Sequence, residues 1–250
     1  VFVIDFVGDI SASACEPLAE QVTAILTQAT PADEVVVRLE SSGGMVHSYG
    51  LAASQLQRIR DKAIPLTICV DKVAASGGYM MACIAHKLLA APFAVLGSIG
   101  VVAQIPNVHR LLKKHDIDYE LFTAGEYKRT VTVLGENTEK GKQKFQQEIA
   151  ETHDLFKSFV SDHRPSLDMD LVATGETWFG KKALEKNLVD AIQTSDDYLY
   201  ARHHDADVFQ VSWVEKHTLA EKLGLATESA VDRLSVRWLE RLEGQRFFIR

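Results

Sequence analysis

The chain has 250 residues, 46% of them hydrophobic and 24% charged, with a formal net charge of −7. This length allows a continuous core, and the composition is that of an ordinary globular protein. The negative charge and the lack of a dense basic cluster argue against nucleic-acid binding, and no segment has the roughly 18 uncharged apolar residues that a membrane span needs.

The chain begins with residues that are already patterned as a strand, Val1 to Phe6, and without an initiator methionine. We therefore expect a fragment from which the natural N-terminus, with any signal or anchor, has been removed. A helix is predicted next over residues 13–29, because Ser13 and Glu16 match a capping box and apolar residues recur on one face.

A β-branched strand is predicted over residues 35–39, followed by a polar loop and a helix that ends near Arg60. The side chains of this helix that we expect to face the core are Leu51, Leu56 and Ile59. An apolar run over residues 64–70 then predicts a buried strand, and helical spacing resumes at Tyr79. The alternation predicts an α/β fold with a parallel sheet, in which ligand-binding groups gather at the carboxyl ends of the strands.

Ser76 lies where a strand is predicted to turn into a helix, within Ala75-Ser76-Gly77-Gly78. A hydroxyl at this place is beside the unpaired N–H groups and the positive end of the helix dipole, which favours negative charge. Ser76 is therefore a candidate nucleophile. The alternative is that Ser76 only caps the helix, which is the commoner role of a serine at such a boundary.

Gly43 and Gly44 follow the strand over residues 35–39. Adjacent glycines let the backbone turn its N–H groups outward and let a substrate approach closely, as an oxyanion hole requires. A tight turn without chemistry is the alternative. Both this loop and Ser76 fall at carboxyl ends of predicted strands.

Lys128 is a candidate general base, because a desolvated lysine loses its proton more readily. Between Tyr127 and Arg129, a solvated surface charge is the alternative. Two other residues are rival bases by proximity: Lys72, four residues before Ser76, and His47, just after the glycine loop.

The second half of the chain predicts further elements. They are a strand over 87–91, a helix over 109–115, a strand over 119–122 that delivers the lysine loop, a long helix between a cap at Asn137 and Pro165 with Phe145, Ile149, Phe156 and Val160 on one face, a strand and helix over 177–189, a solvated loop over 190–206 that includes His203-His204-Asp205, and an amphipathic helix over 219–242. The adjacent histidines have no second cluster at ligand spacing, which argues against a metal site.

Cys15, Cys69 and Cys83 are an odd number of cysteines at wide spacing, with no pattern of paired disulfides. Cys69 and Cys83 are surrounded by apolar residues, and we expect them to fill the core. The cysteines therefore do not indicate whether the protein works in an oxidising or a reducing compartment.

Five motifs occur in order along the chain: Ser41-Ser42-Gly43-Gly44, Ala75-Ser76-Gly77-Gly78-Tyr79, Gly97-Ser98-Ile99-Gly100-Val101, Gly125-Glu126-Tyr127-Lys128 and Gly175-Glu176-Thr177-Trp178-Phe179-Gly180. In this order they resemble the signal peptide peptidase A family of Ser-Lys serine proteases. The continuation from Lys128 to Thr138 looks most like the SohB branch of that family. The likeness extends to about residue 195.

The resemblance implies a serine endopeptidase in which Ser76 attacks the peptide carbonyl and neutral Lys128 takes its proton. It assigns Ser98 as the residue that orients the lysine amine. The N–H groups of Gly77 and of the Gly43-Gly44 loop, Gly44 by preference, would stabilise the oxyanion. No metal or organic cofactor is required, and the expected substrates are apolar extended peptides such as released signal peptides or unfolded membrane-protein segments.

The resemblance also implies an architecture and a setting. The fold would be a ClpP/crotonase-like superhelix of repeated β-β-α units, with a peptidase domain over residues 1–195 and a C-terminal extension over 196–250. The chain would form a ring-like homo-oligomer, in which a neighbouring protomer's lysine completes each site. A missing N-terminal segment would anchor it to the bacterial inner membrane.

Two other functions stay open. An acyl-CoA hydratase or hydrolase could share the fold and the oxyanion loop, but it would not need both Ser76 and Lys128. A catalytically silent scaffold would keep the fold and the oligomer without a reactive serine.

Overall fold

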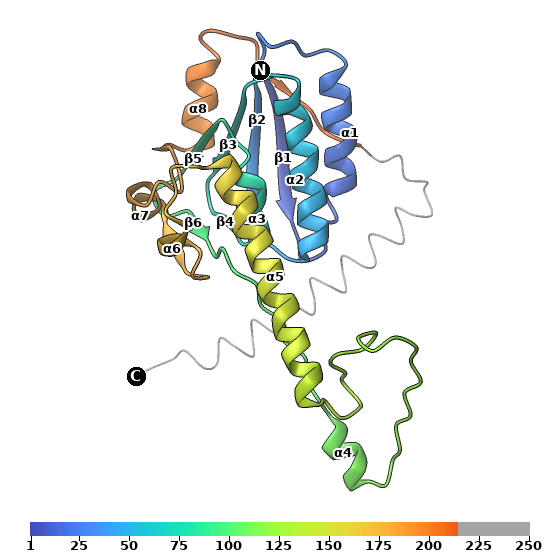
Figure 1. Cartoon of the computed structure of the whole chain (residues 1–250). Helices are drawn as coiled ribbons and strands as arrows, with labels where there is room; N and C mark the ends of the chain where they lie inside the picture. The colour runs from blue at the N-terminus through green and yellow to red at the C-terminus, as the bar shows by residue number, and fades with distance from the viewer. Residues whose placement is uncertain (215–250) are drawn as a thin grey trace, which may run out of the picture. The chain divides into compact units, whose positions relative to one another are not determined.

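The computed structural model describes residues 1–214, and its framework is a nine-stranded sheet (Figure 1). Within these residues every strand pair is parallel except β6 with β7. The order is β7-β6-β4-β2-β3-β5-β8, with β1 beside β2 and β9 beside β1. The strands are β1 (Phe2–Gly8), β2 (Val35–Ser41), β3 (Leu66–Val70), β4 (Val73–Ala75), β5 (Lys87–Ala90), β6 (Val95–Gly97), β7 (Thr177–Phe179), β8 (Ala191–Ile192) and β9 (Phe209–Gln210).

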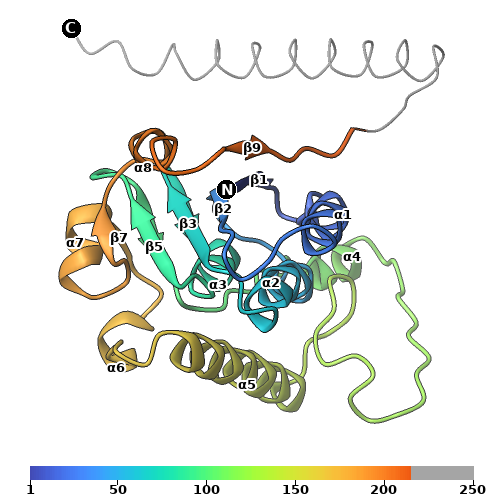
Figure 2. The same cartoon turned by 90° about the horizontal axis from the view of Figure 1, so that it is seen from above.

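Helices cover both faces of this sheet (Figure 2). On one face lie α1, α2 and α3, with α5 packed beyond α3, and α8 lies on the other face. The helices are α1 (Cys15–Leu26), α2 (Val46–Asp61), α3 (Gly77–Ala82), α4 (His109–Lys114), α5 (Glu139–His163), α6 (Met169–Val172), α7 (Gly180–Glu185) and α8 (Ser195–Arg202). The predicted α/β class with a parallel sheet is confirmed. Among the described residues no helix is both long enough and apolar enough to cross a bilayer.

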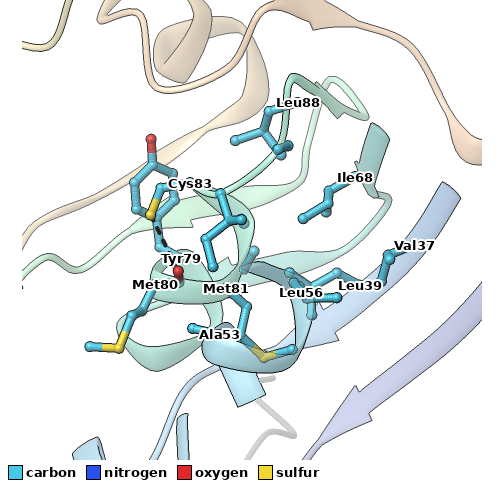
Figure 3. Close-up of a cluster of buried hydrophobic side chains, with 14 of the residues drawn as sticks. Val37, Leu39, Ala53, Leu56, Ile68, Tyr79, Met80, Met81, Cys83 and Leu88 are labelled. Atoms are coloured by element: carbon cyan, nitrogen blue, oxygen red, sulfur yellow. Dashed lines mark hydrogen bonds between the residues drawn. The ribbon is translucent and has the colours of Figure 1, made fainter. Parts of the chain in front are cut away.

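Strand β2 shows why the apolar runs in the sequence are continuous. Val37 and Leu39 face the main core, where they meet side chains of α2 and α3, whereas Val36 faces a smaller cluster with Cys69 and Tyr198 under α8. A strand buried on both faces needs apolar residues at successive positions instead of at alternate ones. Figure 3 shows the main core, in which Val37, Leu39, Ala53, Leu56, Ile68, Met81 and Leu88 gather.

The first helices differ from the prediction at two points. Helix α1 begins after Ala14 without a side-chain cap, so the predicted capping box of Ser13 and Glu16 is wrong. The Asp9 carboxylate accepts the Ser13 N–H at 2.9 Å instead, and this ties Ser13 to the loop before the helix. In α2, Leu56 and Ile59 are buried as predicted, but Leu51 is 56% exposed because it lies on the helix side away from the sheet.

The second half needs more corrections. The strand predicted over residues 119–122 does not form, because no described strand lies alongside to pair with it, and Phe122 is 87% exposed. Thr138, not Asn137, caps α5 by accepting the N–H of Gly141, while the Asn137 side chain bonds the backbone of Thr132. The predicted loop over 190–206 contains β8 and α8, although His203 and His204 are exposed beyond α8. The predicted helix over 219–242 lies outside the described residues.

Candidate active site

Ser76 occupies a sharp turn between β4 and α3. Its backbone has φ 53° and ψ −121°, a left-handed conformation that L-residues rarely adopt and that costs about 1–3 kcal/mol. The turn is held because Ser76 N–H donates to Gly97 O at 2.8 Å. The hydroxyl makes no capping hydrogen bond to α3, so the alternative that Ser76 serves as a side-chain cap is wrong. The half-buried hydroxyl is left at the start of the helix.

The glycine loop lies directly against this turn. Ser41, the last residue of β2, pairs with Ala74 of β4, which brings the two strand ends together. Gly43 has φ +88°, and a Cβ built on it would lie 2.6 Å from Gly77 N and 2.8 Å from Ser76 Cβ. Such contacts are closer than any side chain tolerates. Gly43 therefore lets the loop approach the candidate nucleophile, as an oxyanion loop must.

The hydrogen bonds of this loop distinguish its two glycines. Gly43 N–H donates to Ser41 Oγ at 3.0 Å, so this donor is already occupied. Gly44 N–H and Gly77 N–H donate to no acceptor within residues 1–214. The backbone therefore leaves two donors without an acceptor: one in the loop, next to the Gly43 that contacts Ser76, and one in the first turn of α3, directly after Ser76.

Ser98 lies next to Ser76 across the sheet. Strands β4 and β6 pair Ala75 with Gly97, so the two serines follow neighbouring positions at the same carboxyl end. Ser98 also has a positive φ, 51°, and its N–H donates to Glu176 O at 2.6 Å. Ser76, Ser98, Gly43 and Gly77 are thus brought together by the fold.

Lys128 is not brought to Ser76 within the chain. Its neighbours Glu126 and Tyr127 contact the amino-terminal part of α5: Lys140 bonds Glu126, and its amine lies 5.9 Å from the centre of the Tyr127 ring. Farther along α5, His153 bonds Ile99 O at 3.2 Å, beside Ser98. About 20 Å of helix separates Lys140 from His153. Figure 1 shows this segment and α4 beyond the end of α5 that is remote from the sheet. Lys128 is exposed, and its amine bonds no residue of the described part.

The two alternative bases, Lys72 and His47, differ in their surroundings. Lys72 bonds Glu40 at 2.8 Å, and this carboxylate raises the pKa of Lys72, which keeps the amine charged. A charged ammonium cannot accept the serine proton. His47 lies in the first turn of α2, on the wall of the groove beside the glycine loop.

This groove has a volume of about 840 Å³ and runs from the glycine loop along α5. Its walls are mostly apolar and include Gly44, His47, Met80, Phe145, Ile149 and Phe156. Met80 is one helical turn after Ser76. The groove can therefore hold apolar side chains of a ligand close to the candidate nucleophile.

Sequence reasoning missed two residues of this region. Tyr49 and Ser41 are buried, and their hydroxyls bond each other at 2.5 Å. Ser41 was part of a motif, but nothing in the pattern pairs it with Tyr49. A buried strand that ends in a serine, followed by a tyrosine in the first turns of the next helix, is the only signal available.

Comparison with known proteins agrees with this geometry. The model of "Peptidase family S49" matches residues 58–208, and that of "Peptidase family S49 N-terminal" matches residues 1–56. The chain is 63% identical over 233 residues to a Haemophilus influenzae protein named "Probable protease SohB", with 93% of this chain and 66% of the relative covered. It is 53% identical over 235 residues to the SohB protein of Buchnera aphidicola from Acyrthosiphon pisum, with 94% and 69% covered. The chain spans about two thirds of the length of these relatives. The chain belongs to peptidase family S49.

Proposed function

We propose that the chain is a serine endopeptidase with Ser76 as nucleophile and Lys128 as general base. Ser76 Oγ attacks the carbonyl carbon of a peptide bond, and its proton passes to the neutral Lys128 amine. The same proton is then given to the leaving amine as the C–N bond breaks. Water hydrolyses the resulting acyl-enzyme. Ser98 holds the lysine amine, and Gly44 N–H and Gly77 N–H stabilise the oxyanion.

The observation that carries this proposal is the strained backbone of Ser76 directly beside Gly43. Backbone strain persists only where the surrounding structure imposes it, and it gathers at functional sites. A silent scaffold has no use for a left-handed serine next to two unoccupied N–H donors. An acyl-CoA enzyme of this fold would use the donors without the serine.

The position of Lys128 supports a site that two copies of the chain share. Within one chain, about 20 Å of α5 separates the lysine loop from the region of Ser98. A neighbouring copy in a ring-like homo-oligomer would bring its own lysine loop to Ser76. Burial between the copies would also remove the charge of the amine, as a general base requires.

The apolar groove supports extended apolar peptides as substrates. Released signal peptides and unfolded membrane-protein segments have this chemistry. We further propose that the sheet and its helices belong to the ClpP/crotonase-like class of repeated β-β-α units, and that a segment preceding residue 1 anchors the protein at the bacterial inner membrane. The division into residues 1–195 and 196–250 stays a prediction.

Hydrolysis of a library of apolar peptides by the parent, Ser76→Ala and Lys128→Ala proteins tests the chemistry. We expect both variants to fall to the background rate, because each lacks one half of the proton transfer. The oligomeric state of each variant is the control. If Lys128→Ala retains activity, another base takes the proton, and His47 is the next candidate because Glu40 keeps Lys72 charged. If the parent is silent at high concentration, the peptidase proposal is wrong.

Mixing the two inactive variants tests whether the site is shared. After joint dissociation and reassembly, some Ser76-bearing copies lie beside Lys128-bearing copies. We expect about a quarter of the parent activity for random one-to-one mixing. Activity that stays at background after mixing, while mixed oligomers form, would show that serine and lysine must come from the same chain.

A further inference from the structure

Tyr49 connects the two parts of the candidate site, which are the glycine loop and the turn that carries Ser76. It lies in the first turns of α2 and is fully buried. Its ring packs on the backbone that follows Ser76: a Cβ built on Gly77 would lie 2.4 Å from Tyr49 Cγ. Its hydroxyl belongs to a chain of hydrogen bonds that ends at the glycine loop.

The direction of these hydrogen bonds follows from their ends. Asp9 O is a carbonyl oxygen and can only accept, so Tyr49 O–H donates to it at 2.7 Å. Ser41 O–H must then donate to Tyr49 Oη, at 2.5 Å. A lone pair of Ser41 Oγ is left for Gly43 N–H, at 3.0 Å. Every proton in the relay from Gly43 through Ser41 and Tyr49 to Asp9 therefore has one orientation.

The relay is stable across the neutral pH range. Burial raises the pKa of the Tyr49 phenol above its usual value, so the hydroxyl keeps its proton. The groups around Tyr49 are Ser41 at the end of β2, the Asp9 carbonyl after β1, and the Gly77 backbone of α3. The Asp9 carboxylate bonds Ser11 and Ser13 instead and stays outside the relay.

A loop with two adjacent glycines has more accessible backbone conformations than a loop of the same length without glycine. Donors that stabilise an oxyanion act only if they are oriented before the reaction. In this chain the Gly43 peptide is held by Ser41, and Ser41 is held by Tyr49. The next peptide, which carries Gly44 N–H, lies between this held peptide and Met45, whose N–H donates to Ile10 O at 2.8 Å.

We propose that Tyr49 is a positioning residue for the peptidase reaction, on which this inference rests. Its hydroxyl, through Ser41, orients the glycine loop so that Gly44 N–H points to the oxyanion on the carbonyl that Ser76 attacks. Tyr49 touches neither substrate nor the reacting atoms. Its effect therefore falls on the transition state and not on the binding of the peptide.

The test is Tyr49→Phe, which keeps the ring on Gly77 and removes only the hydroxyl. Complete loss of one oxyanion donor slows catalysis about 100- to 1,000-fold, and a donor that is only misoriented loses part of this. We expect kcat on an apolar peptide to fall about 10-fold or more, with KM within about two-fold of the parent. The affinity for a peptide boronic acid, whose boron becomes tetrahedral on Ser76 Oγ, should fall by the same factor as kcat/KM.

Ser41→Ala removes the next link of the relay and should give the same pattern. Because the two residues act through one hydrogen-bonded chain, the double variant should lose about as much as one single variant, not the product of both. Losses that multiply would mean that Tyr49 does not act through Ser41, and would overturn the relay.

Tyr198→Phe is the matched control. Tyr198 is a buried tyrosine whose hydroxyl donates to Glu34 at 2.5 Å, at the amino end of β2. Ser41 is at the opposite end of this strand, about 20 Å away. The control removes an equivalent hydroxyl and should leave kcat, KM and boronate affinity unchanged.

The outcomes distinguish a failure of the role proposed for Tyr49 from a failure of the proposed peptidase function. If Tyr49→Phe matches Tyr198→Phe in kcat and boronate affinity, Tyr49 only supports the fold and the inference is wrong. The inference is also wrong if Tyr49→Phe and Tyr198→Phe both change kcat and KM in step with a lower melting temperature, because the loss of activity would then come from a less stable fold. A parent protein that neither cleaves peptides nor binds the boronate overturns the proposed function, and this inference with it.

Discussion

A single methyl group at either of two glycines should disable the site. In Gly43→Ala the new Cβ would press on Gly77 N and Ser76 Cβ from a residue with φ +88°. In Gly77→Ala it would press on the root of the Tyr49 ring, which cannot move away. We expect peptidase activity to fall at least about 100-fold in both, as for loss of an oxyanion donor, and stability to fall by about 1–3 kcal/mol. Peptide assays and urea unfolding measure the two effects.

Gly50→Ala is the control for stability. Gly50 is in the interior of α2, and a Cβ built on it meets nothing within 4 Å. Alanine is the better helix former, so this variant should be more stable by up to about 1 kcal/mol. If Gly43→Ala were as active and as stable as Gly50→Ala, the close approach of the loop to Ser76 would be disproved.

The sequence predicted which residues lie near Ser76 better than it predicted their backbone conformations and hydrogen bonds. The glycine pairs and Ser76 could be found because they occur at the ends of predicted strands and in motifs of a known family. The strain at Ser76 and Ser98 could not, because a positive φ is imposed by neighbouring strands and not by the residue itself. The link from Ser41 to Tyr49 depends on the side-chain directions of two different elements.

At the scale of elements, α8 is fastened to the sheet by a buried carboxylate. Glu34, just before β2, accepts hydrogen bonds from Tyr198 at 2.5 Å, Thr67 at 2.6 Å and Arg202 at 2.9 Å. Burial, with the Glu34 hydrogen bond, raises the pKa of Tyr198 to about 12. The unfolded chain has an ordinary tyrosine pKa near 10. The folded state therefore holds this proton more tightly than the unfolded state.

This difference predicts a loss of stability in alkali. The contribution of Tyr198 is fully present below about pH 10 and is lost as the pH rises towards 12, by up to about 3 kcal/mol. Urea unfolding of the parent and of Tyr198→Phe between pH 9 and pH 11.5 measures it. The two free energies of unfolding should converge as the pH rises. Curves that stay parallel would contradict the assignment.

One element that the sequence failed to predict is a very short strand. Strand β4 has three residues and is separated from β3 by only two, so residues 64–75 were interpreted as one strand and a turn. Without β4, Ser76 would follow β3; with it, Ser76 follows a strand that pairs with both β2 and β6. The strand predicted over 119–122 had the apolar residues but no neighbour, and backbone pairing needs both.

At the scale of the whole molecule, a shared site predicts that activity depends on protein concentration. Because Lys128 and Ser76 lie apart in one chain, a dissociated copy would lack its proposed base. We expect activity per mole to fall towards zero on dilution, at the concentration where sedimentation shows the oligomer dissociating. Activity per mole that stays constant down to the monomer would contradict the shared site.

No sequence pattern could have revealed this separation. The number of residues between Ser76 and Lys128 does not indicate whether the two side chains meet within one chain or between two copies. Leu121 and Phe122, near the lysine loop, are exposed apolar side chains, as expected of a segment that packs against another copy in a shared site.

The reach of the lysine loop away from its own serine also has a genetic consequence. In a shared site, a subunit with Ser76→Ala would still supply its lysine to the next subunit, and one with Lys128→Ala would still supply its serine. In a cell with two alleles, neither mutation alone would be dominant negative. Peptidase activity would be proportional to the fraction of subunits made from the intact allele. Two different loss-of-function alleles would complement each other. An allele that blocks assembly would do neither, because its product would not enter the proposed oligomer.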